Sequence, residues 1–178
     1  MPPSSYPWLQ IGREISEILS GIDASSFELL VRALEPADRR WFFTGQGRSG
    51  LSARMAAMRF MHIGRSVHFV GEVSAPSIRR DDGLLVVSAS GHTPVSLAFA
   101  RIARDEGAIV AAVTGDIRSP LAQIADVLLP VPAGPTAQFG GSLFEQCSLI
   151  LLDSLILQLT DGTPGAHDAM RYRHTNLQ

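Results

Sequence analysis

The chain has 178 residues, of which 46% are hydrophobic and 18% are charged, and its formal net charge is −2. This length predicts one globular domain with a full hydrophobic core. Domains that bind nucleic acid usually carry a basic face, so the near-neutral charge argues against a nucleic-acid partner. All 15 positions counted as Lys or Arg are Arg, which excludes chemistry through a lysine Schiff base.

The cysteine content and the apolar segments bear on metal sites and on location. Cys147 is the only cysteine, so an internal disulfide and a cysteine metal site are excluded, and we expect no metal and a buried Cys147. No charged segment followed by an apolar one stands at the N-terminus, so we expect no secretory signal. The apolar stretch 143–159 is interrupted by four polar residues, which argues against a membrane span. We therefore expect a cytoplasmic protein with no membrane partner.

The first forty residues predict a short arm and two helices. Residues 1–7 are rich in Pro and Ser and are expected to be flexible. Apolar residues recur at helical spacing over 8–19, and Ser25-Ser26 can cap a second helix that ends near Pro36. We thus expect helices within residues 8–40, before the first strand.

From residue 41 onward, predicted strands and helices alternate. Strands are expected at 41–44, 67–70, 84–88, 109–114 and 127–131, and helices at 49–63, 94–106, 120–125 and 141–160. Continuously apolar strands separated by helices are typical of a parallel sheet covered on both faces. The prediction is an α/β fold: a three-layer αβα sandwich with a five-stranded, parallel, doubly wound sheet. The whole chain is expected to be one domain, with residues 161–178 forming a tail that contributes to the site.

Two short turns follow predicted strands and precede predicted helices. They are Gly45-Gln46-Gly47-Arg48-Ser49-Gly50 and Ser88-Ala89-Ser90-Gly91-His92-Thr93. In such sheets ligands bind beyond the carboxyl ends of the strands. A helix start offers unpaired N–H groups and the positive end of the helix dipole, which suits a phosphate. The two turns therefore predict a site for a phosphorylated small molecule.

A dinucleotide site is an alternative for the first turn. Gly45-x-Gly47-x-x-Gly50 has the spacing of the dinucleotide fingerprint, and no Gly-Lys-Ser/Thr of a P-loop occurs. The second strand does not end on an acidic residue, although Glu72 follows shortly after it. Because a dinucleotide fold has no need of the serine-rich second turn, this alternative of a dinucleotide-binding oxidoreductase ranks last.

Taken together, these segments resemble the sugar isomerase (SIS) domain family and, within it, the 6-phospho-3-hexuloisomerases. The resemblance runs over nearly the whole chain. It rests on segments 44–50, 70–72, 113–115, 119–126, 144–145 and 152–153, on Met58-Arg59-Phe60-Met61-His62 and Ser88-Ala89-Ser90-Gly91, and on the tail Arg173-His174-Thr175-Asn176-Leu177.

The resemblance implies an activity and the residues that would carry it. The family interconverts D-arabino-3-hexulose 6-phosphate and fructose 6-phosphate through a cis-enediol, with no cofactor. By resemblance, the phosphate is held by the turn amides, which include that of Gly47, and by Ser49, Ser88, Ser90 and Thr93. The alternative role for these side chains is ordinary capping and turn chemistry.

The resemblance also assigns Glu145 and His174 to the chemistry. Glu145 is the candidate base, at the start of an otherwise apolar helix where partial burial would make it a stronger base. Its alternative role is a first-turn carboxylate that interacts with the helix dipole. His174 would move protons among the substrate oxygens or open the sugar ring, whereas a tail histidine in isolation is usually solvated.

Three further residues are site candidates that each have an ordinary structural alternative. Arg48 would meet the phosphate or a substrate hydroxyl, or else lie on the surface at a helix start. Arg59 has the same two alternatives with less support. His62 is equally well explained as a half-buried histidine on the helix after the first turn.

The second turn departs from the family pattern Ser-Gly-Ser-Gly-Glu-Thr at two positions. Ala89 replaces a glycine, which is compatible only if the backbone there does not need a positive φ. His92 replaces a glutamate and puts a titratable cation beside the phosphate site. It would strengthen anion binding at mildly acidic pH or change the sugar that is accepted.

Other activities of the same superfamily stay open. They are isomerisation of arabinose 5-phosphate or sedoheptulose 7-phosphate, and phosphosugar sensing without catalysis. The N-terminal helices and the last long helix carry more apolar surface than one sandwich needs. We therefore expect a homodimer or homotetramer with sites near subunit boundaries, in which His174 serves either its own site or that of a neighbouring subunit.

Overall fold

The computed structural model describes residues 6–177 as seven helices and five strands. The helices are α1 (Pro7–Ser20), α2 (Ala24–Leu34), α3 (Gly47–His62), α4 (Pro94–Asp105), α5 (Pro120–Ile124), α6 (Ser142–Thr160) and α7 (Ala166–Arg173). The strands are β1 (Trp41–Gly45), β2 (Val67–Phe69), β3 (Gly83–Val87), β4 (Ile109–Thr114) and β5 (Val127–Pro130).

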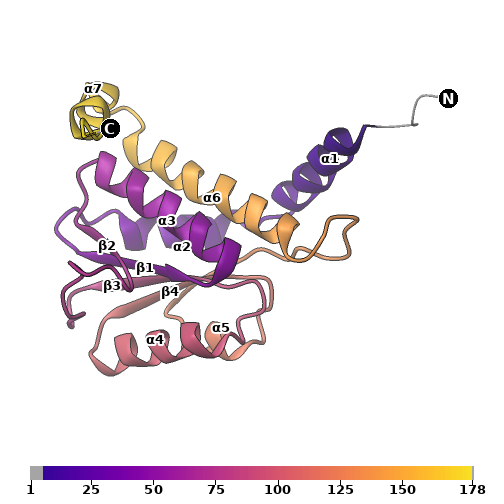
Figure 1. Ribbon diagram of the computed structural model, residues 1–178, viewed down its shortest axis with the longest axis horizontal. Helices are drawn as coiled ribbons and strands as arrows, with labels where there is room; N and C mark the ends of the chain where they lie inside the picture. Colours follow the sequence, from indigo (N-terminus) through magenta and orange to yellow (C-terminus); the bar gives the residue numbers. More distant parts are fainter. Residues whose placement is uncertain (1–5, 178) are drawn as a thin grey trace.

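The five strands form one parallel sheet in the order β2-β1-β3-β4-β5. Helices α2, α3 and α6 pack on one face and α4 and α5 on the other (Figure 1). The predicted three-layer α/β sandwich is thus confirmed. The chain leaves β1 outward to β2 and then returns to β3 on the other side of β1. Ligands bind at such a reversal of strand order, so the crevice between the ends of β1 and β3 is the expected site.

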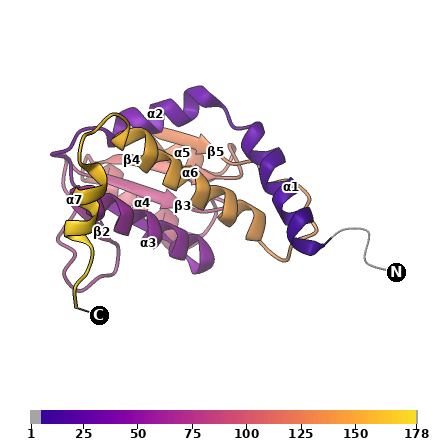
Figure 2. The same ribbon diagram turned by 90° about the horizontal axis from the view of Figure 1, so that it is seen from above.

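Helices α3 and α6 run side by side across the upper face of the sheet, and α1 and α7 lie at opposite ends of the molecule (Figure 2). By length and composition alone, helix α6 is long and apolar enough to span a membrane. Its residues Leu143, Phe144, Leu152 and Leu155 are nevertheless buried in the hydrophobic core. Cys147 on the same helix is also fully buried, as predicted. Packing against the sheet accounts for the apolar character of α6.

The structure corrects the sequence analysis at both ends of the chain. Residues 161–178 contain helix α7, where only a tail was predicted. The sequence signal was weak because the helix is largely polar and only Met170 packs against the core. The predicted flexible arm, residues 1–7, extends one residue too far, because Pro7 is the first residue of α1. This position suits the fixed φ of proline. Residues 1–5 of that arm lie outside the described residues.

Helix α2 is capped by Asp23, and the prediction of a Ser25-Ser26 cap is wrong. The Asp23 carboxylate accepts hydrogen bonds from Ser26 N at 2.8 Å, Ser26 Oγ at 2.7 Å and Ser25 Oγ at 2.8 Å. These bonds, the Ser26 hydroxyl first, lower the pKa of Asp23 from 3.8 to about 2. The two serines therefore orient the Asp23 carboxylate and favour its charged form, whereas Asp23 itself is the cap.

A pH titration tests this cap. Because the pKa of Asp23 is depressed in the fold, its contribution to stability is complete above about pH 4 and is lost as the pH falls through about 2. Asp23→Asn keeps a capping oxygen but removes the charge. We expect the thermal midpoint of the wild type to exceed that of Asp23→Asn at pH 5, and the difference to shrink steeply as the pH falls from about 4 to about 2. A difference that is independent of pH would contradict this role.

Candidate functional site

The first turn brings the start of α3 unusually close to the sheet. A Cβ atom added at Gly50 would lie 2.5 Å from the Gly45 carbonyl oxygen, and one at Gly45 would lie 2.8 Å from the Val87 carbonyl oxygen. Glycine is thus required at both positions for the backbones to approach. Gln46, the N-cap residue of α3, makes no capping hydrogen bond through its side chain. The first-turn N–H groups of α3 are consequently available to a ligand.

The second turn is built around Gly91. This residue has φ +63°, and an added Cβ would lie 2.1 Å from Ser119 Oγ. The described residues include no non-glycine residue with a positive φ, so Ala89 fits the turn without the conformational freedom of glycine. Ser88 is buried, and its Oγ lies 3.4 Å from Thr93 Oγ1. The two hydroxyls therefore lie together at the start of α4.

Both turns end at the same edge of the sheet. Gly45 pairs with Val87 in the register of β1 and β3, so the starts of α3 and α4 meet at the β1–β3 crevice from opposite faces. Thr93 is the N-cap of α4, as predicted, but its side chain makes no capping bond. Ser119, by contrast, accepts a bond from Ala122 N and caps α5. Uncapped helix starts, a buried serine and converging dipoles make the crevice suited to a phosphate.

The remaining polar residues of the second turn lie at its rim. Ser90 and His92 are exposed. Ser90 Oγ accepts a hydrogen bond from His92 N at 3.2 Å, and His92 Nδ1 lies 2.6 Å from the Ser90 carbonyl oxygen. His92 therefore folds back onto its own turn, at the solvent side of the crevice.

Glu145 lies beside the first turn, in the first turn of α6. Its carboxylate forms an ion pair with Arg48 Nε, and Ser52 Oγ lies 3.4 Å from the Glu145 carbonyl oxygen. The Glu145 side chain is only 13% exposed, whereas that of Arg48 is 62% exposed. The guanidinium of Arg48, which reaches solvent, thus links the largely buried Glu145 carboxylate to the segment Gly47-Arg48-Ser49.

Arg59, His62 and His174 form a second cluster at the other end of α3. The rings of His62 and His174 stack with centroids 5.3 Å apart. Burial lowers the pKa of His62 below its usual value, with smaller contributions from the charges of Arg59 and His174. At 1.5 Å per residue, Arg48 and His62 are separated by about 21 Å along α3. One chain therefore does not bring this cluster to Glu145.

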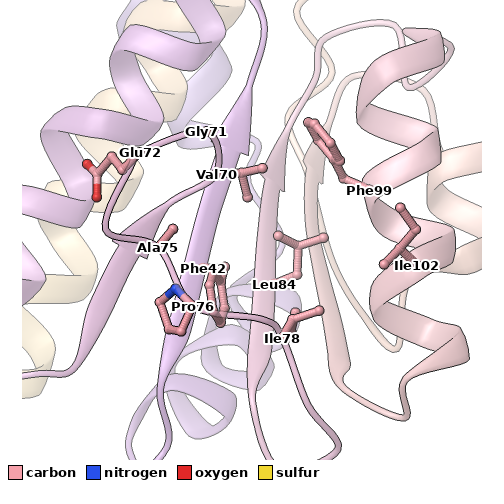
Figure 3. A pocket seen from close by; sticks show the side chains of 10 residues that line it. All are labelled: Phe42, Val70, Gly71, Glu72, Ala75, Pro76, Ile78, Leu84, Phe99 and Ile102. Atoms are coloured by element: carbon pink, nitrogen blue, oxygen red, sulfur yellow. The ribbon is translucent and has the colours of Figure 1, made fainter.

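An apolar cavity of about 250 Å³ lies on the opposite face of the sheet, between α4 and the chain that follows β2 (Figure 3). Phe42, Leu84 and Phe99 point into it, whereas the carboxylate of Glu72 points away. Glu72 accepts a hydrogen bond from the Phe69 N–H of its own segment. This arrangement gives no support to a ribose-binding role for Glu72.

Sequence reasoning missed the surroundings of Arg48. A pocket of about 380 Å³ adjoins this residue, between α1, the chain before α6 and the start of α6. Its polar lining includes Gln10, Glu14, Gln138 and Gln146. Gln10 and Glu14 read in the sequence as ordinary polar positions of an amphipathic helix, so no pattern marked them.

Two uncapped helix starts meet at the switch point of this α/β domain, and a carboxylate lies beside them. This is the site of a protein that anchors a small phosphorylated ligand. The chain belongs to the SIS domain family, whose model matches residues 34–159. It is 37% identical over 174 residues to a 3-hexulose-6-phosphate isomerase of Mycobacterium gastri, covering 93% of this chain and 86% of the relative. It is 33% identical to the enzyme of that name from Methylomonas aminofaciens, covering 87% and 90%.

A solved structure from Methanococcus jannaschii shares the fold with a TM-score of 0.86 and 28% identity, covering 96% of this chain and 98% of that chain. For that protein, a molecular function of 3-hexulose-6-phosphate isomerase was inferred from its structure. The similarity thus extends over the two turns, α6 and the C-terminal segment rather than over the sheet alone.

Proposed function

We propose that this protein is a phosphosugar isomerase that interconverts D-arabino-3-hexulose 6-phosphate and fructose 6-phosphate without a cofactor. The observation that carries the proposal is the Arg48–Glu145 pair, which sets a largely buried carboxylate beside an uncapped helix start. The names of the relatives support the choice of sugar. A sugar phosphate is a charged molecule that does not cross a bilayer unaided, which supports a cytoplasmic location.

One part of the site anchors the phosphate, and another part carries out the chemistry. The phosphate binds to the first-turn N–H groups of α3 and to the hydroxyls of Ser49, Ser88 and Thr93, with Ser90 and His92 at the rim. This anchor leaves the other end of the sugar free to lie against Arg48 and Glu145. Because the anchor is remote from the reacting carbons, its binding energy serves to orient them.

Glu145 is the base of the reaction. It removes the proton from C3 of fructose 6-phosphate, the electrons of the C3–H bond form the C2–C3 double bond, and those of the C2 carbonyl bond pass to the C2 oxygen, which gives an enediolate. His174 of a neighbouring subunit moves the proton of the C3 hydroxyl to the C2 oxygen, C3 becomes the carbonyl carbon, and Glu145 returns a proton to C2. Arg48 donates hydrogen bonds to the enediolate oxygens, which carry the developing negative charge.

Solvent deuterium exchange tests this proposal and separates the alternatives. Fructose 6-phosphate is incubated with the protein in D₂O and followed by NMR. The proposed reaction requires exchange at C3, whereas isomerisation to an aldose requires exchange at C1. Binding without exchange at either carbon would contradict catalysis and favour a phosphosugar sensor. Exchange seen only with arabinose 5-phosphate or sedoheptulose 7-phosphate would reassign the substrate.

We further propose that the protein is a homo-oligomer, built on the outer face of α3 and α6. This face carries exposed apolar side chains at helical spacing: Leu51, Met55, Met58 and Met61 on α3, and Ile150 and Leu157 on α6. A twofold interface matches the same patch of two copies. If the two α3 helices pair in opposite directions, the Arg59, His62 and His174 end of one chain lies beside the Arg48 and Glu145 end of its partner.

A complementation experiment tests whether His174 serves a neighbouring subunit. Glu145→Gln and His174→Gln are each expected to be nearly inactive. If His174 acts across the interface, a mixed oligomer holds some sites with both native residues, and mixing the two variants restores activity. If His174 acts within its own chain, every site carries one defect and no activity returns. A monomer at micromolar concentration would also contradict the proposal.

A further inference from the structure

Residues 132–141 connect β5 to α6 and lead directly into the turn that carries Glu145. The backbone bond from Glu145 N to the Gly141 carbonyl oxygen joins this segment to α6. The other backbone bonds of the segment are local, such as those from Ala133 N to Val131 O and from Ser142 N to Phe139 O. Ala133 packs against the hydrophobic core, and beyond it the position of the segment depends on side chains from elsewhere in the fold.

For residues 136–138, the side chain of Glu14 on α1 supplies such contacts. Glu14 accepts hydrogen bonds from Thr136 Oγ1 at 2.5 Å, Gln138 Nε2 at 3.1 Å and Ala137 N at 3.3 Å. Among the described residues, these are the hydrogen bonds that tie the segment to a secondary-structure element other than α6. The bond from Thr136, followed by that from Gln138, lowers the pKa of Glu14, so the carboxylate is held in its charged, accepting form.

Helix α1 has few other attachments near this point. It has no buried residue, and Trp8 and Leu9 in its first half are 63% and 50% exposed. Only the second half of α1, with Ile15, Ile18 and Leu19, packs against the core. Glu14 thus stands at the junction between the packed half of α1 and the half that faces the pocket beside Arg48.

We propose that Glu14 is a positioning residue: it holds residues 136–138 against α1 and thereby fixes the pocket wall and the start of α6 next to the Arg48–Glu145 pair. The proposal rests on the proposed isomerase function. A free segment would let the first turn of α6 shift, and a shift of about 1 Å in a catalytic group can lower a rate about a hundredfold. The pocket of about 380 Å³ that this wall encloses lies where the sugar chain would extend from the anchored phosphate.

Amide hydrogen exchange and steady-state kinetics, measured on the same variants, test the proposal. Glu14→Ala is expected to speed exchange at the Ala137 amide by at least about tenfold, because this N–H loses its acceptor. The same variant is expected to lower kcat by about tenfold or more, with KM changed by less than about threefold. Glu14→Gln keeps one accepting oxygen but replaces the other with an NH2 donor, so both values are expected to lie between those of the wild type and those of Glu14→Ala.

Controls separate positioning from a general loss of stability. Glu17→Ala, one turn further along α1 and exposed, is expected to leave exchange and kinetics unchanged. If Glu14→Ala does not fold, Thr136→Val removes the shortest of the three bonds and is expected to shift both values in the same direction. Unchanged exchange at Ala137, or faster exchange with unchanged kcat, would overturn the proposal. If the wild type isomerises no phosphosugar, the proposed function fails, and the exchange measurement alone still decides whether Glu14 holds the segment.

Discussion

Replacing Glu145 with Gln is expected to lower the rate of C3 hydrogen exchange by about 10²–10⁴-fold, the usual contribution of one general base. Gln keeps the size of the side chain and its partial burial, but it cannot remove a proton. Arg48 loses its anionic partner, while the phosphate anchor on α3 and α4 stays intact. Affinity for fructose 6-phosphate is therefore expected to stay within about threefold of the wild type, so that the loss falls on kcat. Calorimetric titration with NMR exchange measures both quantities.

A matched control exists on the same helix. Asp153 is an exposed carboxylate of α6, two turns beyond Glu145. Asp153→Asn makes the same charge change and is expected to leave exchange unchanged. Comparable losses in the two variants would show that the charge of α6, and not the position of Glu145, sets the rate. Loss of binding together with exchange in Glu145→Gln would assign Glu145 to the anchor.

Replacing Gly50 with Ala is expected to destabilise the fold by about 2–3 kcal/mol, because the new Cβ would overlap the Gly45 carbonyl oxygen. Both groups in this overlap are backbone atoms, so a change of rotamer cannot relieve it. The start of α3 must move away from β1, which also displaces the N–H groups at Gly47 and Ser49. We expect the thermal midpoint to fall by about 5–10 °C and phosphosugar affinity to fall with it. Differential scanning fluorimetry, with and without fructose 6-phosphate, measures both effects.

Gly12→Ala is the control for this substitution. Gly12 lies within α1, and an added Cβ would meet no atom within 4 Å. Alanine is favoured over glycine inside a helix, so this variant is expected to be more stable by about 0.5–1 kcal/mol, with affinity unchanged. If Gly50→Ala were as stable as Gly12→Ala, the close approach at the first turn would not be required.

The sheet could be predicted from the sequence because its strands are continuous apolar runs separated by segments with helical patterns. The two turns followed from the position of their glycines and hydroxyls after those strands. The structure explains their glycines individually: Gly45 and Gly50 by backbone contact, and Gly47 and Gly91 by their positive φ. Ala89 is compatible with the second turn because its backbone does not need the conformation that glycine provides.

The rest depends on contacts that no local pattern encodes. Helix α7 is polar and held by one apolar residue, so periodicity did not reveal it. The contact of Arg48 with Glu145 joins residues 97 positions apart, and that of Glu14 with Thr136 joins residues 122 apart. His174 and Glu145 lie near opposite ends of α3, and this separation likewise follows from packing. A role for His174 in the site remains a prediction, and it requires a second subunit.

The central claim is that the two turns anchor a phosphate while Glu145 reaches the reacting carbons. A crystal structure of Glu145→Gln with fructose 6-phosphate tests it most directly, because slow turnover retains the bound sugar. The account predicts the phosphate within hydrogen-bond distance of Ser88 and of the first-turn N–H groups of α3, with the side chain at position 145 next to C2 and C3. A phosphate bound elsewhere, or a sugar chain directed away from position 145, would contradict it.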